Sequence, residues 1–334
     1  MGKGTARRIT LAVAAARALG ERALHGIGYD AVAARIIADH VIDAALCGYE
    51  YSGLAKILNI AEHPRFKAPS GPMRVLRETA VSTLLDGGNA VGMLALYHAA
   101  KAAIAKAEAQ GIALIGVTNT WMSGRSAHYV EMIARADLAA IHTASCTRMV
   151  APLGGRRPIL GTNPIAFAVP SAREPVIFDM GTSAFMMTEL MLRERLGQEL
   201  PPAVALDAAG EPTRDPAAAR QGALLPFGGR KGFGLGFFVH AFGVLAGASL
   251  DLDGDNGYLL IAFKPDLLMP LAEVKRDITA LVERVKAVPR QADVAEIRVP
   301  SEQSFRNRAR ALAADRLEID RSIYDALESL AARR

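Results

Sequence analysis

The fold of this chain is decided by residues 111–142, which read GIALIGVTNTWMSGRSAHYVEMIARADLAAIH. The run Ile112-Ala-Leu-Ile-Gly-Val117 is short and apolar, as buried strands are. Residues 126–134 are predicted to form a helix, and Leu138–His142 is a second strand-like run. A strand, a helix and a strand in succession predict an α/β domain.

The same alternation continues on both sides of this stretch. Upstream, Asp86-Gly-Gly-Asn89 predicts a turn between a strand-like run over residues 74–86 and a helix over residues 90–110. Further strands are predicted at residues 176–180, 259–263 and 296–299, and further helices at residues 188–196, 231–245 and 271–287. The ends of the chain predict helices within residues 9–46 and 302–333, whereas loops are predicted over residues 47–72, 151–170 and 197–230.

The composition excludes several classes of protein. The chain has 334 residues, of which 51% are hydrophobic and 22% charged, and this predicts a folded protein with a full core. Its basic residues are scattered and the net charge is only +5, so no nucleic-acid partner is expected. No run approaches the roughly 18 apolar residues of a membrane span. The two cysteines do not suggest a disulfide framework, so a cytoplasmic location is expected.

No metal site is expected from the sequence. Cys47 and Cys146 lack the spacing of zinc ligands, and no H-E-x-x-H motif occurs. The acidic segment Asp251–Asp255 begins like a calcium loop. It lacks the glycine at the sixth place and the glutamate at the twelfth, so a solvated turn explains it better.

Two segments suit an anionic ligand. Gly228-Gly-Arg-Lys-Gly232 precedes a predicted helix whose free N–H groups could face phosphate oxygens, although a flexible turn with a solvated Lys231 is the alternative. Phe178-Asp-Met-Gly-Thr-Ser183 places Asp179 at the end of an apolar strand, where α/β proteins bind ligands. The alternative role for that acid is a helix N-cap. No G-x-G-x-x-G follows a strand in the first domain, so a Rossmann fold is not predicted.

Together these segments resemble the malate/L-lactate dehydrogenase-like oxidoreductase family. The stretches that carry the resemblance are residues 86–92, 150–155, 160–167, 178–183, 222–229 and 231–235. The resemblance implies a non-Rossmann α/β fold like that of sulfolactate dehydrogenase, and a homodimer. It also implies a helical domain built from both termini (residues 1–72 with 300–334) and an α/β region (residues 73–299) that binds cofactor and substrate.

The resemblance also implies residues that contact NAD or NADP. These are Asp179-Met180-Gly181, with Asp179 also a catalytic candidate, and Lys231-Gly232. Ser145 is a weaker candidate. Arg306 and Arg308 near the C-terminus could meet the 2′-phosphate of NADP, and a solvated helix face explains them as well.

The chain departs from the family at three positions, which makes it a divergent member. Ser52 follows Tyr51 where the family's D-S-H-G-like motif has its histidine. Met122 stands in place of a second histidine, and a methionine cannot transfer a proton. Lys56 replaces an arginine suited to a substrate carboxylate, which keeps the charge and loses the two-pronged hydrogen bonding.

The missing histidines require another proton donor, because reduction of a carbonyl needs an acid near neutral pH. Tyr51 is the best substitute by position, although it could also be a packing tyrosine. Glu50 and His128 are further candidates. Arg148 could bind a substrate carboxylate in place of the lost arginine, or be solvated.

Three functions remain open at this point. The first is an NAD(P)H-dependent oxidoreductase that acts on a small 2-oxo carboxylate with a different proton donor. The second is an imine reductase for 2-imino carboxylates, since a protonated iminium needs less help from an acid. The third is a catalytically impaired, nucleotide-binding regulatory or structural homologue. The segments around Asp179 and Lys231 favour cofactor binding in all three.

Overall fold

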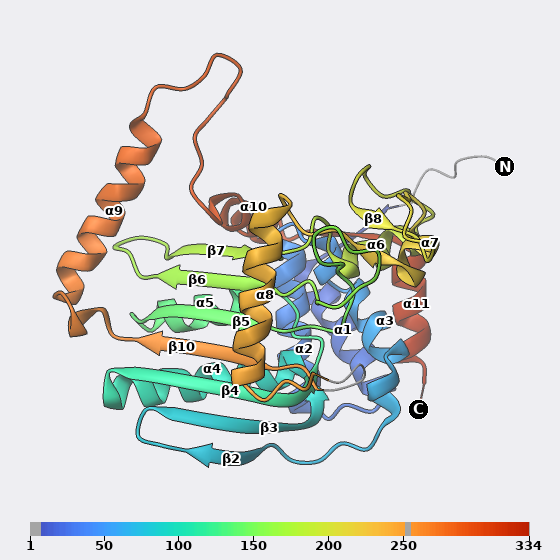
Figure 1. The fold of residues 1–334 in the computed structure, drawn as a ribbon, viewed down its shortest axis with the longest axis horizontal. Helices are drawn as coiled ribbons and strands as arrows, with labels where there is room; N and C mark the ends of the chain where they lie inside the picture. Colours follow the sequence, from blue (N-terminus) through green and yellow to red (C-terminus); the bar gives the residue numbers. More distant parts are fainter. Residues whose placement is uncertain (1–7, 251–254, 334) are drawn as a thin grey trace.

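A seven-stranded mixed sheet forms the centre of the molecule (Figure 1). The computed structural model describes residues 8–250 and 255–333, so most of the Asp251–Asp255 segment lies outside the described residues. Strands β3 and β4 are parallel and the other neighbours are antiparallel. The sheet order is β2 (Arg74–Glu78), β3 (Ser82–Val91), β4 (Ile112–Trp121), β10 (Tyr258–Phe263), β5 (Ala139–Ala144), β6 (Ile165–Val169) and β7 (Val176–Met180).

Helices cover both faces of this sheet. In the view of Figure 1, α4 (Gly92–Gln110) and α5 (Ser126–Arg135) lie behind the strands, and α8 (Arg230–Leu245) crosses in front. The inner face of α4 consists largely of alanines, which let the helix approach the sheet closely. The predicted strand–helix–strand unit is therefore confirmed as β4, α5 and β5.

The two ends of the chain meet in a helical layer beside the sheet. Strand β1 (Arg8–Leu11) pairs antiparallel with β11 (Leu317–Asp320). Around an apolar core pack α1 (Val13–Gly26), α2 (Ala31–Leu46), α3 (Ala55–Glu62) and α11 (Arg321–Ala331), with α10 (Glu302–Ala313) against α2. This core also includes Val91, Met93 and Trp121 from the sheet region, so the proposed division into two domains remains a proposal.

Smaller elements complete the chain. A satellite core lies under α6 (Met187–Arg195), α7 (Pro216–Gln221) and the short pair β8 (Ala205–Leu206) and β9 (Ala223–Leu224). Helix α9 (Leu271–Ala287) buries none of its residues and stands away from the body in Figure 1. Single 3-10 turns are η1 (Glu50–Ser52), η2 (Pro64–Lys67) and η3 (Pro265–Leu267). None of the described helices is long and apolar enough to cross a membrane.

Several local predictions were wrong, and β6, α7 and the pair β8 and β9 also lie within segments predicted as loops. Residues 296–299 form no strand, because they lie beyond the sheet and Glu296 instead pairs with Arg306. Helix α3 lies inside the segment predicted to be irregular, since its apolar residues are buried all round rather than on one stripe. The pair β1 and β11 interrupts the helices predicted at both termini. The Asp86–Asn89 turn is a bulge within β3, where the register shifts between Asp86 and Ala90.

Candidate active site

A cavity of about 330 Å³ lies between the helical layer and the sheet. Helix α3, the loop after β4, the segment after β5 and helix α6 supply most of its wall. The wall is mainly apolar, with methionines prominent. Its residues include Ser52, Lys56, Asn59, His63, Met122, Cys146, Met149, Thr162, Met186, Met187, Met191, Arg220, Asn256 and Tyr258.

Lys56 is the most unusual group on this wall. Its side chain belongs to the first turn of α3 and is only 3% exposed. Burial lowers the pKa of its ammonium group to about 8, and the nearby Cys146 and Asp179 oppose that effect only in part. Among the described residues, no carboxylate forms an ion pair with it. A cation held in this way is a ready partner for a bound anion or for an atom that accepts a proton.

Asp179 stands at the end of β7, behind the cavity wall. Its Oδ2 accepts a hydrogen bond of 2.8 Å from the backbone N–H of Ala127, in the first turn of α5. Burial raises the pKa of Asp179, while the Ala127 hydrogen bond and the charges of Arg125 and Lys56 act in the opposite direction. The carboxyl group therefore supports the start of α5 and balances part of the charge around the cavity.

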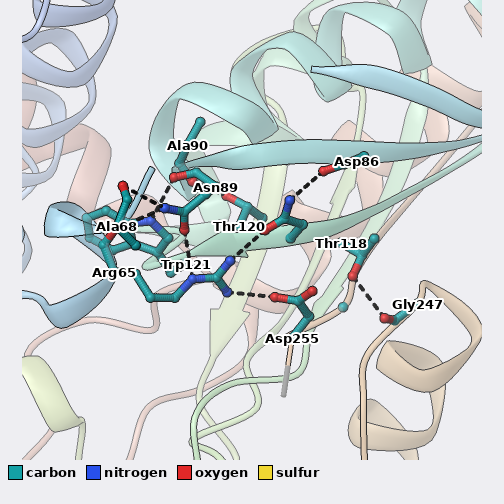
Figure 2. A network of polar contacts seen from close by, with 12 residues as sticks. Arg65, Ala68, Asp86, Asn89, Ala90, Thr118, Thr120, Trp121, Gly247 and Asp255 are labelled. Atoms are coloured by element: carbon teal, nitrogen blue, oxygen red, sulfur yellow. Dashed lines mark hydrogen bonds and ion pairs between the residues drawn. The ribbon is translucent and has the colours of Figure 1, made fainter. Parts of the chain in front are cut away.

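The loop that carries Met122 is held by a polar network around Arg65 (Figure 2). The Arg65 guanidinium donates to Asn89 Oδ1 at 2.8 Å and to Asn119 Oδ1 at 2.6 Å, and it pairs with Asp255 at 2.8 Å. Asn119 Nδ2 in turn donates to Asp86 Oδ1 at 2.7 Å. These hydrogen bonds hold the bulge of β3 against the end of β4. They therefore fix the point from which the loop after β4 enters the cavity wall.

A second set of contacts holds the same loop from behind. The backbone N–H of Arg125 donates to His40 Nε2 at 2.8 Å. Gly124 has a φ of +80°, and an added Cβ would lie 2.2 Å from that nitrogen, so glycine is required here. The Arg125 side chain pairs with Asp43 at 2.9 Å, and His128 Nδ1 lies 3.7 Å from the same carboxylate. His128 therefore belongs to this supporting cluster and does not line the cavity.

The structure brings three of the predicted catalytic and substrate-binding residues together and separates the others. Ser52, Lys56 and Met122 all line the cavity. Tyr51 does not: its ring packs edge-on against Tyr49, at 6.0 Å between centroids, and against the helical core. Burial also raises the pKa of Tyr51, which makes its hydroxyl a poorer acid.

Glu50 and Arg148 also point elsewhere. Glu50 pairs with Arg8 at the surface, so it is not available to a ligand in the cavity. Arg148 follows the cavity residue Thr147, but its guanidinium donates to the carbonyl of Leu250. Neither residue lines the cavity wall.

Of the predicted cofactor residues, those at the end of β7 lie beside the cavity, whereas Ser145 has a structural role. Gly181 backs the cavity, because an added Cβ would lie 2.6 Å from Sδ of Met186, a residue of its wall. Met180, the last residue of β7, is partly exposed beside it. Ser145 is instead a structural residue, since its Oγ bonds both the N–H and the carbonyl of Gly257, at 2.8 and 3.2 Å.

Arg306 and Arg308 bind acidic side chains of their own chain. Arg306 pairs with Glu296 at 2.6 Å and with Glu302 at 2.5 Å. Arg308 pairs with Asp43 and Glu131 at 2.7 and 2.6 Å. Intramolecular carboxylates thus already occupy both guanidinium groups proposed for a 2′-phosphate.

The start of α8 offers an open, cationic surface. Gly228 and Gly229 have φ values of +55° and +61°, and an added Cβ at either would meet nothing within 4 Å. Lys231 is exposed, and none of the described residues forms an ion pair with it. The backbone N–H of Phe227 donates to Thr182 at 2.9 Å, which ties this turn to the strand end that backs the cavity. The first turn of α8 therefore presents backbone N–H groups and a lysine of the kind that bind phosphates.

Sequence reasoning missed much of the cavity wall. It did not single out Cys146, whose thiol has its pKa raised to about 11 by burial, nor Arg220 and the methionines of α6. The pair Met186-Met187, which follows the Phe178–Ser183 segment after two residues, was the available indication. Methionine side chains adapt their shape to a ligand, which suits the wall of a substrate cavity.

Comparison with known proteins places this geometry in a family. The family model for malate/L-lactate dehydrogenase matches residues 11–328. L-sulfolactate dehydrogenase of Methanothermobacter thermautotrophicus is 32% identical over 89% of both chains. The Δ1-pyrroline-2-carboxylate/Δ1-piperideine-2-carboxylate reductase of Pseudomonas putida is 34% identical over 67% of this chain and 68% of its own. The crystal structure of a dehydrogenase from Sinorhizobium meliloti superposes with a TM-score of 0.90 at 27% identity, covering 98% and 99% of the two chains.

The chain belongs to the malate/L-lactate dehydrogenase family and has its fold, as the sequence predicted. A fold like that of sulfolactate dehydrogenase is likewise confirmed, with a TM-score of 0.83 to the enzyme of Methanocaldococcus jannaschii at 27% identity. The relatives are dehydrogenases and reductases, so the protein is an oxidoreductase by class.

Proposed function

We propose that the protein is an NAD(P)H-dependent reductase of a small 2-oxo or 2-imino carboxylate. The observation that carries this proposal is the buried cationic Lys56 in a mainly apolar, methionine-lined cavity. Such a cavity favours a compact substrate with one anionic group. The names of two relatives agree with it, since sulfolactate and Δ1-pyrroline-2-carboxylate are both small carboxylates. Arg220, a second cation on the wall, already pairs with Glu194 at 2.8 Å, so a substrate carboxylate would share it with that side chain.

The dinucleotide is assigned to the surface between the cavity and α8. Gly181 lets Met186 of the cavity wall pack against the strand end, while Lys231 and the amides of Lys231 and Gly232 receive the phosphates of the dinucleotide. Reduced nicotinamide supplies the hydride when it is bound. Because Arg306 and Arg308 are engaged in ion pairs, neither supports a preference for NADP, and both NAD and NADP stay in the proposal.

We expect Lys231→Ala to weaken NAD(P)H binding by about 1.5–3 kcal/mol, the range for a hydrogen bond to a charged group. Fluorescence titration of the dinucleotide measures this change. Lys101→Ala, on the exposed face of α4, is the matched control and should bind as the wild type does. Equal affinity in all three proteins would remove Lys231 from the cofactor site.

The substrate half of the proposal is tested by following NAD(P)H absorbance. Pyruvate alone, pyruvate with methylamine, and a cyclic 2-imino acid are compared at equal concentrations. The two positions where the family has histidines hold Ser52 and Met122, so we expect the imino substrates to react faster. Faster reduction of pyruvate alone would favour a hydroxyacid dehydrogenase. Binding of the dinucleotide without any turnover would favour the regulatory alternative.

We also propose a homodimer and a cytoplasmic location. Large apolar side chains are exposed along α8 and α9, among them Phe238 at 62%, Leu245 at 76% and Leu281 at 56%. Exposed apolar surface of this extent commonly marks a protein interface. Light scattering at micromolar concentration gives the mass, and a stable monomer would rule the dimer out.

The proposed cytoplasmic location is supported by the cysteines. Cys47 and Cys146 are both free thiols, which suits a reducing compartment.

A further inference from the structure

We propose that Lys56 is the proton donor of this site and that its amine replaces the missing histidines. The inference rests on the proposed function, because it assigns a step within that reaction. Lys56 is buried and lines the cavity, and its amine can be charged or neutral. None of the described residues forms an ion pair with it. A residue used only to anchor a carboxylate would serve better as an arginine.

The position of Lys56 relative to Ser52 supports this role. Ser52 ends η1 and Lys56 lies in the first turn of α3, and both side chains line the cavity. The wall also carries Met122, where the second histidine would stand. Lys56 therefore shares one ligand space with both positions that lost their histidines.

Several charged or titratable groups face Lys56 from other elements. Asp179 at the end of β7 and Cys146 after β5 favour its protonated form. His40 on α2 is near enough for the Lys56 charge to depress the histidine's pKa. Burial outweighs the two favourable groups, so the lysine pKa falls to about 8. An acid with a pKa this close to neutral pH is efficient at proton transfer.

Other titratable groups on the wall are less suitable as proton donors. Glu62 pairs with Arg195, and burial raises the pKa of the Cys146 thiol to about 11. His63 stacks on Trp121, with 4.3 Å between ring centroids, and its Nδ1 accepts a hydrogen bond from the Arg65 N–H at 3.2 Å. Both contacts fix that ring at the edge of the network around Arg65. Tyr258 is 1% exposed, and burial raises its pKa, so its hydroxyl is a weak acid.

In the proposed step the substrate gains one hydride and one proton. The bound dinucleotide would supply the hydride for the new C–H bond at the 2-oxo carbon and be oxidised, so the C=O π bond breaks and its electron pair moves to oxygen. That oxygen takes a proton from Lys56 Nζ, so an O–H bond forms, an N–H bond breaks and the lysine is left neutral. With a 2-imino substrate the same proton goes to the imine nitrogen. Solvent then returns a proton to Lys56.

The first test measures Lys56 without any reaction. In the free protein, labelling with acetic anhydride over a range of pH, followed by peptide mass spectrometry, reports when each lysine becomes a neutral amine. We expect Lys56 to reach half of its full reactivity near pH 8. Ordinary exposed lysines reach it near about pH 10.4, and Lys67 is the internal reference. A Lys56 profile that coincides with that of Lys67 would overturn the proposal.

The second test separates a proton donor from a carboxylate anchor. Lys56→Met removes the amine, and Lys56→Arg keeps the charge but cannot release a proton at neutral pH. If Lys56 is the donor, both variants lose about 10²–10⁴-fold in kcat on the best wild-type substrate. If it only anchors the carboxylate, Lys56→Arg keeps kcat and changes KM alone. Lys67→Met, at an exposed lysine of η2, controls for removal of a positive charge.

The dependence of kcat on pH gives a further readout. The donor must be protonated, so wild-type kcat for reduction should fall as the pH rises through about 8. Lys56→Arg should lack this fall. Unchanged kcat in Lys56→Met, with an active wild type, defeats the lysine assignment and leaves the proposed function intact. An inactive wild type defeats the proposed function, while the labelling result still reports on Lys56.

Discussion

Arg308→Met is expected to lower the free energy of unfolding by about 3–5 kcal/mol, the cost of removing one partner from a buried ion pair. The Arg308 guanidinium bridges Asp43 and Glu131, at 2.7 and 2.6 Å, and so joins α10 to α2 and α5. The side chains of Asp43 and Glu131 are 17% and 8% exposed, so water cannot fully replace the lost cation. Urea unfolding followed by circular dichroism measures the change.

A variant on the same helix provides the control. Arg310 is exposed and donates to Asn307 at 2.6 Å. Arg310→Met should change stability by no more than about 0.5 kcal/mol, as surface substitutions usually do. Arg308→Lys should recover part of the loss, because the ammonium group keeps the charge but lacks the planar, two-pronged hydrogen bonding of the guanidinium. A stable Arg308→Met protein would mean that Asp43 is sufficiently neutralised by Arg125 alone.

The second large effect is a loss of stability in mild acid. His40 and His142 are 1% and 0% exposed, and burial lowers the pKa of both, to about 4 for His142. The unfolded chain binds these protons from about pH 6.5, whereas the folded protein does not. Stability should therefore be complete above pH 6.5 and fall as the pH decreases towards 4. Each histidine contributes up to about 1.4 kcal/mol per pH unit in that window.

His142→Asn isolates one of these contributions. His142 Nδ1 lies 3.0 Å from the Leu259 carbonyl, which can only accept, so the ring donates there and its Nε2 is left without a partner. An asparagine keeps a donor for that carbonyl and cannot titrate. The slope of unfolding free energy between pH 6.5 and 5 should decrease in His142→Asn and stay unchanged in His25→Asn, a variant at an exposed histidine. Equal slopes in all three proteins would contradict the assignment.

Much of the fold could be predicted from the sequence because its determinants are local. The apolar runs of β4 and β5, the glycine that ends α4, and the acid at the end of β7 are each readable within a few residues. The resemblance to the family was read from such segments, and the comparisons confirm it. The turn before α8 is local in the same sense, since its two consecutive glycines, both with positive φ, are visible in the sequence as a turn signal.

The site itself depended on contacts that no local pattern contains. Tyr51 and Lys56 lie five residues apart, and the sequence favoured the tyrosine as proton donor because it adjoins the lost histidine. In the structure the tyrosine packs against Tyr49, while Lys56 enters the cavity between elements distant in the chain.

What the sequence determined by itself was therefore the family and the order of most strands and helices. The tertiary structure decided which side chains share the cavity, that β1 pairs with β11, and that Arg306 and Arg308 are engaged by carboxylates. The physical reason is that periodicity and turn chemistry act between near neighbours, whereas burial, pKa shifts and ion pairing depend on groups brought together from distant positions.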